Sequence, residues 1–249
     1  MPDARRALEE EIAGLRRQVE EQRVAAEAQQ RQLERYAADL RETFKAERSR
    51  AQALSRSYMD TVRALSNAVE ARDAYTGKHA ERVAAYGLEI AQVVGLSVAG
   101  HPEIEFGFLL HDVGKVAIPD AILYKPEPLS DDERRLMERH TVIGWEILRD
   151  IDFLGEAKQV VRSHHERWDG EGYPDGLARE QIPLAARVFS VADTLDALTT
   201  TRPYRLASPL GEGRKIISGA AGGQFDPAVV EAFGRIPDAT LETIRREVG

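Results

Sequence analysis

The feature that most constrains the fold is a long stretch without helix breakers near the start of the chain. Between Gly14 and Gly77 the sequence contains neither glycine nor proline, and Ala, Glu, Gln, Arg and Leu dominate it. These five residue types have high helix propensities, whereas glycine and proline cost about 1 and about 3 kcal/mol in a helix interior. The stretch therefore predicts one long helix.

A seven-residue repeat of apolar side chains runs along this predicted helix. The a and d positions of the repeat, called the seam below, are Leu8, Ile12, Leu15, Val19, Gln22, Ala26, Gln29, Leu33, Tyr36, Leu40, Thr43, Glu47, Arg50 and Leu54. Nine of these fourteen are apolar or alanine, which is typical of a coiled coil. A single solvated helix rich in charge pairs is the alternative. We predict a parallel homodimer through a coiled-coil helix at residues 1–57, with a weak polar seam from Thr43 to Arg50.

Residues 58–249 have a different pattern, with shorter amphipathic segments separated by Gly and Pro. Ser130 to Glu133, "SDDE", predicts a capping box at a helix start, and Asp226 followed by Pro227 predicts another start. No segment shows sustained period-two alternation, so we predict an all-α domain. The glycine-rich stretch from Trp168 to Pro183 is long enough to be a functional loop.

Composition excludes several classes of function. The chain has no cysteine, which rules out disulfides, thiolate metal sites and cysteine nucleophiles. Its net charge of −8 argues against general binding to DNA, RNA or acidic membranes. No apolar run approaches the roughly 20 residues of a membrane span. We therefore expect a soluble cytoplasmic protein without a membrane span.

Histidines and carboxylates suggest a metal site. "HDVGK", His111 to Lys115, directly follows the apolar run "FGFLL", where unpaired charges would be costly to bury. Of the six histidines, His101 stands beside a proline and is expected on the surface. The other five, with Asp112 and Asp193, are residue types that suit Fe, Mn or Zn. The spacing alone leaves a metal site and ordinary core histidines equally open.

Several motifs together resemble one family. "HDVGK", then "HTVIG", "HHERWDGEGYP", "VADTLDAL" and "RPYR", are similar to the HD-GYP family of HD phosphohydrolases, from about Val69 to Phe233. Its members are all-helical bacterial phosphodiesterases that hydrolyse cyclic di-GMP, or in some cases cyclic GMP-AMP, at a metal centre. The resemblance implies an HD-type helical bundle at residues 58–249 after the coiled-coil helix. It also implies a cyclic dinucleotide substrate and two divalent cations per chain, Fe or Mn first, with Zn, Ni or Mg as alternatives.

The resemblance assigns the ligands residue by residue. One cation would be held by His79, His111, Asp112 and Asp193. The other would be held by Asp112, which bridges the two, and by His140, His164 and His165. Lys115 resembles the catalytic lysine of the family, and a continuing helix would place it on the face of His111 and Asp112. Its role would be to stabilise or protonate the leaving group.

Substrate contacts are implied by two further motifs. Gly172, Tyr173 and Pro174 would border the pocket, where Tyr173 either stacks on a guanine or pins the loop. Arg202 and Arg205 resemble a phosphate- and base-contacting pair, although two exposed arginines paired with surface acids are the alternative. We expect four residues to orient imidazoles, with ordinary salt bridges as an equal alternative: Arg82, Glu166, Arg167 and Asp196.

One position separates this chain from part of the family. Members that resemble a three-metal type carry a glutamate four residues before the first histidine ligand, and Tyr75 stands there in this chain. A phenol is a poor ligand at ordinary pH, because its pKa is about 10. Asp73, six residues before His79, would point away on a continuous helix. We therefore expect two metals and an accumulating pGpG product.

Two rival functions remain at this stage. A non-catalytic signalling module could bind protein partners through the GYP loop and the coiled coil, although the intact ligand set and Lys115 argue against it. An HD hydrolase of linear nucleotides would have no reason for the GYP loop.

Overall fold

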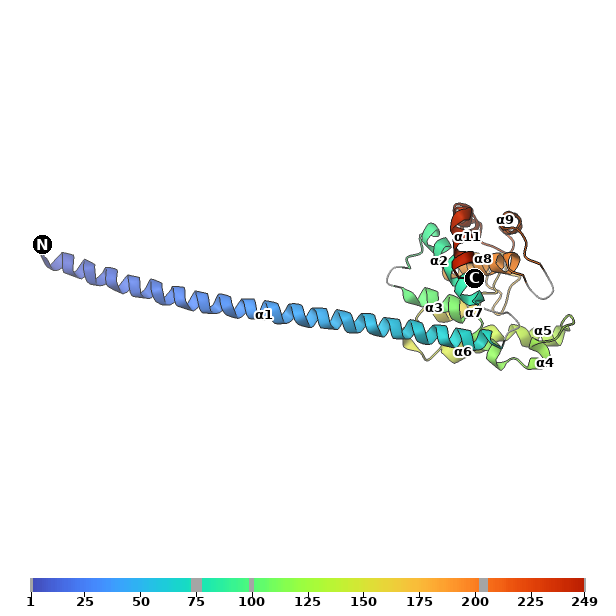
Figure 1. The fold of residues 1–249 in the computed structure, drawn as a ribbon, viewed down its shortest axis with the longest axis horizontal. Helices are drawn as coiled ribbons and strands as arrows, with labels where there is room; N and C mark the ends of the chain where they lie inside the picture. The colour runs from blue at the N-terminus through green and yellow to red at the C-terminus, as the bar shows by residue number, and fades with distance from the viewer. Residues whose placement is uncertain (1, 73–77, 99–100, 202–205, 249) are drawn as a thin grey trace. The chain divides into compact units, whose positions relative to one another are not determined.

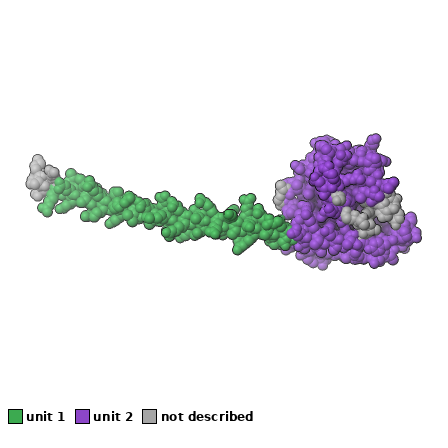
Figure 2. All heavy atoms as spheres, viewed as in Figure 1, with its two compact units in different colours: residues 1–58 green, residues 59–249 purple. Residues whose placement is uncertain are grey.

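The computed structural model describes residues 2–72, 78–98, 101–201 and 206–248 (Figure 1). These residues form helices and no strand, so the all-α prediction is confirmed. The chain divides into two units, Met1–Tyr58 and Met59–Gly249 (Figure 2). Within the described ranges, no helix combines the length and apolarity needed to cross a membrane.

The predicted long helix is α1, Pro2–Glu70. In the first unit its seam side chains are exposed, for example Leu15 at 56% and Leu40 at 66%. Charge pairs line the same helix, such as Arg23 with Glu27 at 3.0 Å. The helix is confirmed, and the pairing of two such helices stays a prediction.

Short helices make up the rest of the second unit. Their bounds are α2 His79–Val94, α3 Pro102–Leu110, η1 Val113–Ala117, α4 Asp120–Leu123, α5 Asp131–Glu138, α6 His140–Leu148, η2 Asp152–Leu154, α7 Ala157–Ser163, η3 Arg179–Gln181, α8 Leu184–Thr199, α9 Leu210–Gly219, α10 Pro227–Gly234 and α11 Asp238–Glu247. Both predicted helix starts are confirmed, because Ser130 forms the capping box with Glu133 and Asp226 accepts a hydrogen bond from the Ala228 N–H.

The core of this unit lies between α8 and the helices around it. Helix α8 packs against α2, and α7 packs against both α3 and α6. Phe108 of α3 and Phe189 of α8 are fully buried with ring centroids 5.6 Å apart. The imidazoles of His111 and His164 lie 4.7 and 5.6 Å from the Phe189 ring. The hydrophobic core therefore supports the histidines directly.

The chain after α3 differs from the predicted continuous helix. Helix α3 ends at Leu110, and η1 is a 3₁₀ helix. In a 3₁₀ helix, side chains three residues apart are eclipsed. Lys115 accordingly lies beside Asp112, with 2.8 Å between Nζ and Oδ2.

A close backbone contact fixes η1 against α6. A Cβ atom on Gly114 would overlap the carbonyl oxygen of His140 and lie 2.6 Å from the Gly144 nitrogen. Glycine is therefore required in "HDVGK", because any side chain would push the two segments apart. The contact sets the separation between Asp112 and His140.

Candidate metal centre

The seven side chains predicted as metal ligands gather in one place. They are His79 at the start of α2, His111 and Asp112 after α3, His140 at the start of α6, His164 and His165 after α7, and Asp193 in α8. Contacts between neighbours link all seven into a single group. By contrast, His101 is exposed, as expected, and its Nδ1 lies 2.9 Å from Glu103 Oε1.

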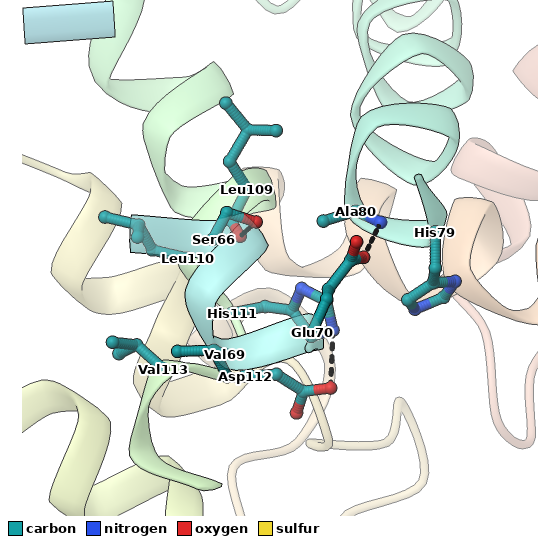
Figure 3. A pocket seen from close by; sticks show the side chains of 10 residues that line it. All are labelled: Ser66, Val69, Glu70, His79, Ala80, Leu109, Leu110, His111, Asp112 and Val113. Atoms are coloured by element: carbon teal, nitrogen blue, oxygen red, sulfur yellow. Dashed lines mark hydrogen bonds and ion pairs between the residues drawn. The ribbon is translucent and has the colours of Figure 1, made fainter. Parts of the chain in front are cut away.

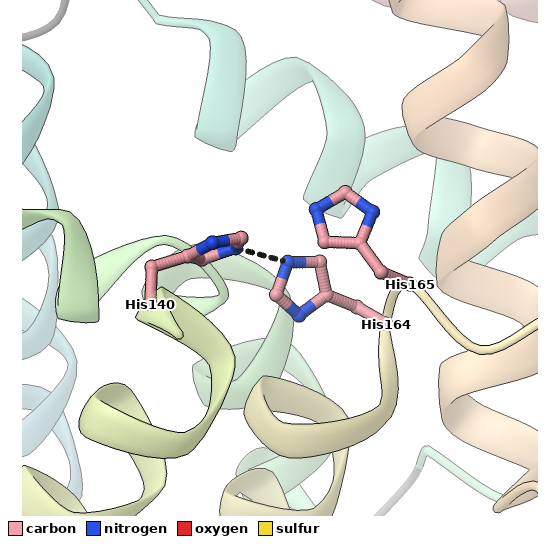
Figure 4. Close-up of side chains that lie close together, drawn as sticks. All are labelled: His140, His164 and His165. Atoms are coloured by element: carbon pink, nitrogen blue, oxygen red, sulfur yellow. Dashed lines mark hydrogen bonds between the residues drawn. The ribbon is translucent and has the colours of Figure 1, made fainter. Parts of the chain in front are cut away.

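Three of the histidines form a compact cluster (Figure 4). The Nε2 atoms of His140 and His164 lie 3.2 Å apart, and the candidate ligand atoms of the three histidines all lie within 4.8 Å of one another. Burial holds the pKa of His164 well below its ordinary value and lowers the pKa of His165 to about 4. Since the neutral imidazole is the form that binds metals, this cluster could hold a cation.

Backbone contacts orient several of these imidazoles. The Nδ1 atoms of His111, His140 and His164 each lie 2.7–2.9 Å from the carbonyl oxygen three residues earlier. A carbonyl accepts only, so Nδ1 carries the proton and donates it. In the neutral ring, Nε2 is then the nitrogen that would bind a metal.

Asp112 lies between two sets of histidines. Its Oδ2 is 3.0 Å from His111 Nε2, and its Oδ1 is 3.4 Å from His140 Nε2 and 4.0 Å from His164 Nε2. Burial alone would raise the pKa of Asp112, but His111 and Lys115 hold it well below its usual range. An ionised carboxylate with its two oxygens directed to different imidazoles fits a bridge between two cations.

His79 is oriented by a buried ion pair. Its Nδ1 lies 2.7 Å from Asp196 Oδ2, and its Nε2 lies 3.4 Å from Asp193 Oδ1. Arg82 Nε donates to Asp196 Oδ1 at 2.7 Å. Burial would raise the pKa of Asp196, but His79 and Arg82 lower it to about 2. Asp196 and Arg82 thus make the contacts that an imidazole-orienting role requires.

The glycine-rich loop is anchored to the residue after the histidine pair. The buried Glu166 carboxylate accepts hydrogen bonds from the Asp175 and Leu177 N–H groups at 2.8 and 3.0 Å. A Cβ on Gly172 would lie 2.6 Å from Glu166 Cα, so the backbone is close enough to require glycine. Glu166 therefore contacts the loop, where the sequence had suggested contact with an imidazole.

Tyr173 packs against the cluster from within this loop. Its ring stacks on His165 with centroids 4.8 Å apart and an interplanar angle of 28°. A cis peptide bond joins Tyr173 to Pro174. Arg167, expected to orient an imidazole, pairs with Asp169 at 2.5 Å on the loop itself.

A polar pocket opens beside the histidine pair. Of the three residues predicted to border it, Gly172 and Tyr173 line this pocket, whereas Pro174 is not among its lining residues. Residues predicted for other roles also line it, namely His164, His165, Glu166, Arg167 and Asp193. Sequence reasoning missed Glu138, Ser190, Thr194 and Gln224, which also line it. Ser190 and Thr194 stand four residues apart on α8, around Asp193, and that spacing was an available signal.

Some predicted residues cannot be placed. Arg202 and Arg205, as well as Asp73 and Tyr75, lie outside the described residues.

Comparison with known families settles which family these motifs represent. The profile of a family described as "HD domain" matches residues 63–229, a span that contains all seven candidate ligands and the GYP loop. The chain belongs to the HD-GYP family. The HD-GYP resemblance of the sequence is thereby confirmed.

Relatives of this HD-GYP chain include proteins named as cyclic dinucleotide phosphodiesterases. A "cyclic di-GMP phosphodiesterase" of Thermotoga maritima is 41% identical over 180 residues, covering 72% of this chain and 49% of that protein. A "3'3'-cGAMP-specific phosphodiesterase 2" of Vibrio cholerae is 39% identical over 195 residues, covering 78% of this chain and 35% of that protein. The chain thus spans about half, or less, of the length of these relatives.

Solved structures share the HD-GYP fold. A cyclic GMP-AMP specific phosphodiesterase of Vibrio cholerae matches with a TM-score of 0.57 and 21% identity, over 74% of this chain and 50% of that chain. An HD-GYP-type protein of Bdellovibrio bacteriovorus matches with a TM-score of 0.51 and 22% identity, over 62% and 50%.

Proposed function

We propose that this chain is a metal-dependent phosphodiesterase that hydrolyses cyclic di-GMP to linear pGpG. The observation that carries the proposal is Asp112, whose two carboxylate oxygens are directed to different histidine sets. The names of the relatives support the substrate class, since they are cyclic di-GMP or cyclic GMP-AMP phosphodiesterases. The reaction is the attack of water on a phosphodiester and the release of a 3′ oxygen.

We propose the two ligand sets that the family resemblance implies. We assign His79, His111, Asp112 and Asp193 to one cation, and Asp112, His140, His164 and His165 to the other. We favour Fe or Mn over Zn, Ni or Mg, because imidazole and carboxylate ligands suit them. When bound, the cations would lower the pKa of water and neutralise phosphate charge.

Other residues of the chain would bind and protonate the substrate. Lys115, whose Nζ lies 2.8 Å from Asp112 Oδ2, would stabilise or protonate the leaving oxygen. The polar pocket lined by Tyr173, Ser190 and Thr194 would take the rest of the dinucleotide. Arg202 and Arg205 stay proposals for phosphate and base contacts.

Cyclic GMP-AMP is the second candidate substrate, because the Vibrio cholerae relative is named for it. The test is incubation of the anaerobically prepared 249-residue chain with each cyclic dinucleotide, followed by product chromatography. We expect faster turnover of cyclic di-GMP. A faster reaction with cyclic GMP-AMP would reverse the substrate assignment, and hydrolysis of neither would contradict the phosphodiesterase proposal.

The first prediction concerns metal count and product. We expect two metals per chain and accumulation of pGpG with slow or no conversion to GMP, because Tyr75 offers no carboxylate for a third cation. Elemental analysis and a time course of the products measure both. Three metals per chain, or rapid release of GMP as the sole product, would contradict this prediction.

The second prediction concerns assembly through α1. We propose that a second copy covers the exposed apolar seam of the first unit, which gives a parallel dimer. Leu33→Glu at a seam position should shift the mass in light scattering toward the monomer. Val24→Glu is a matched control, because Val24 is 52% exposed but lies off the seam. A chain that starts at Ser57 and keeps the dimeric mass would show that the seam is not the dimerising element.

A further inference from the structure

The last turns of α1 that belong to the second unit lie close to two of the ligand candidates (Figure 3). Ser66, Val69 and Glu70 of α1 line one pocket together with residues of α2 and of the α3 end. That pocket also includes His79 and His111. Two hydrogen bonds link this part of α1 to the backbone next to these histidines.

The first bond ties α1 to the start of α2. Glu70 Oε1 accepts a hydrogen bond from the Ala80 N–H at 2.5 Å, and Ala80 is the residue after His79 (Figure 3). The N-cap residue of α2 is Lys78, whose side chain has donors only and makes no cap hydrogen bond. The N–H groups of a first helical turn have no partner within the helix. Glu70 therefore supplies an acceptor that the local sequence does not.

The second bond ties α1 to the end of α3. Ser66 is buried, and its Oγ donates to the Leu109 carbonyl at 2.8 Å. The neighbouring carbonyl, that of Phe108, accepts from His111 Nδ1 at 2.9 Å. Carbonyls in the last turn of a helix also lack intrahelical partners. Ser66 thus holds the last turn of α3 at Leu109, and the carbonyl of the preceding residue, Phe108, orients His111.

These two contacts come from one face of one helix. Ser66 and Glu70 are four residues apart, so they lie one turn apart on the same side of α1. The rings of His79 and His111, which stand one and two residues from the bonded Ala80 and Leu109, meet edge to face with centroids 5.6 Å apart. A rigid helical turn thereby sets the spacing between two segments of the chain that are otherwise joined through residues 81–108.

We propose that Ser66 and Glu70 are positioning residues for His79 and His111. Both histidines belong to the same proposed ligand set, so the inference rests on the metal centre described under the proposed function. The other set contains His140 and His164, whose orienting carbonyls belong to Met137 and Val161, and neither of these residues is next to the Leu109 and Ala80 groups that Ser66 and Glu70 bond. Loss of the α1 contacts should therefore weaken one of the two cations and spare the other.

The experiment measures metal binding by the full chain. Metal-free wild type, Glu70→Ala, Glu70→Gln and Ser66→Ala are titrated with Mn²⁺ by calorimetry, and bound Mn²⁺ is counted by elemental analysis. Wild type should bind two Mn²⁺. In Glu70→Ala and Ser66→Ala, one Mn²⁺ should bind as in wild type and the other about 10- to 100-fold more weakly, as for outer-shell partners elsewhere.

Two variants separate positioning from general damage to the fold. Glu70→Gln keeps an oxygen acceptor of the same reach and should keep both Mn²⁺ affinities close to those of wild type. Asn67→Ala, on the same turn of α1 but exposed, should have no effect. Should Glu70→Ala fail to fold, Ser66→Ala compared with Asn67→Ala decides by the same readout.

The outcomes distinguish this inference from the proposed function. Wild-type affinities for both Mn²⁺ in Glu70→Ala and Ser66→Ala would overturn the positioning role and leave the metal centre intact. An equal loss of both cations, or damage by Glu70→Gln as large as by Glu70→Ala, would also overturn it. A wild-type chain that binds no Mn²⁺ would instead overturn the metal centre itself, and the inference with it.

Discussion

Replacing Asp112 by alanine is expected to remove both metals and reduce turnover to background. Asp112 is the one carboxylate directed to both histidine sets among the described residues, with Oδ2 near His111 and Oδ1 near His140. Its loss leaves each set one charged ligand short. The effect on activity should exceed the about 10- to 100-fold loss typical of an outer-shell partner. Elemental analysis and a phosphodiesterase assay of the variant measure it.

A matched control variant distinguishes the loss of the metal ligand from general unfolding. Asp150→Ala removes a carboxylate whose side chain is 86% exposed, and it should leave metal content and rate unchanged. Circular dichroism should show the same helix content in both variants. Two metals per chain in Asp112→Ala would remove the bridging assignment.

Lys115→Ala should also lose turnover, but unlike Asp112→Ala it should retain both metals. Its Nζ lies 2.8 Å from Asp112 Oδ2 and offers no lone pair to a cation while it is protonated. A positioned proton donor contributes about 10²- to 10⁴-fold to rate, so kcat should fall by that range. Lys115→Met, which keeps the length of the side chain, should behave in the same way. Metal loss equal to that of Asp112→Ala, or a change confined to KM, would contradict the role in the chemical step.

Features that depend on neighbours in the sequence were predictable. The capping box at Ser130 and the N-cap at Asp226 involve residues two or three positions apart, so a short window of sequence contains both partners. The long helix α1 follows from the absence of breakers in the same way. The ligand candidates were recognisable because their motifs are dense in imidazole and carboxylate and arrive in the order of a known family.

Contacts between distant segments were not predictable in the same way. The end of the helix after α3 is accompanied by a close contact between Gly114 and the backbone of α6. The residues of "HDVGK" alone do not indicate that α6 lies there. The role of Glu166 depends on where the loop backbone folds back. Likewise, Ser66 and Glu70 stand outside every recognised motif. Their partners are backbone groups, which every residue type carries, so the sequence does not show which residues they will contact.

The wide separation of the ligand candidates along the chain has a consequence for the stability of the fold as well as for the chemistry. A chain without cysteine cannot form disulfides, yet a cation held by both His79 and Asp193 would join helices α2 and α8, which lie far apart in the sequence. Because the assembled site does not exist in the unfolded chain, the free energy of metal binding would add to the free energy of folding. Metal binding would stabilise the native state in proportion to the logarithm of free metal. The concentration of free metal would then determine the stability of the domain as well as its proposed activity.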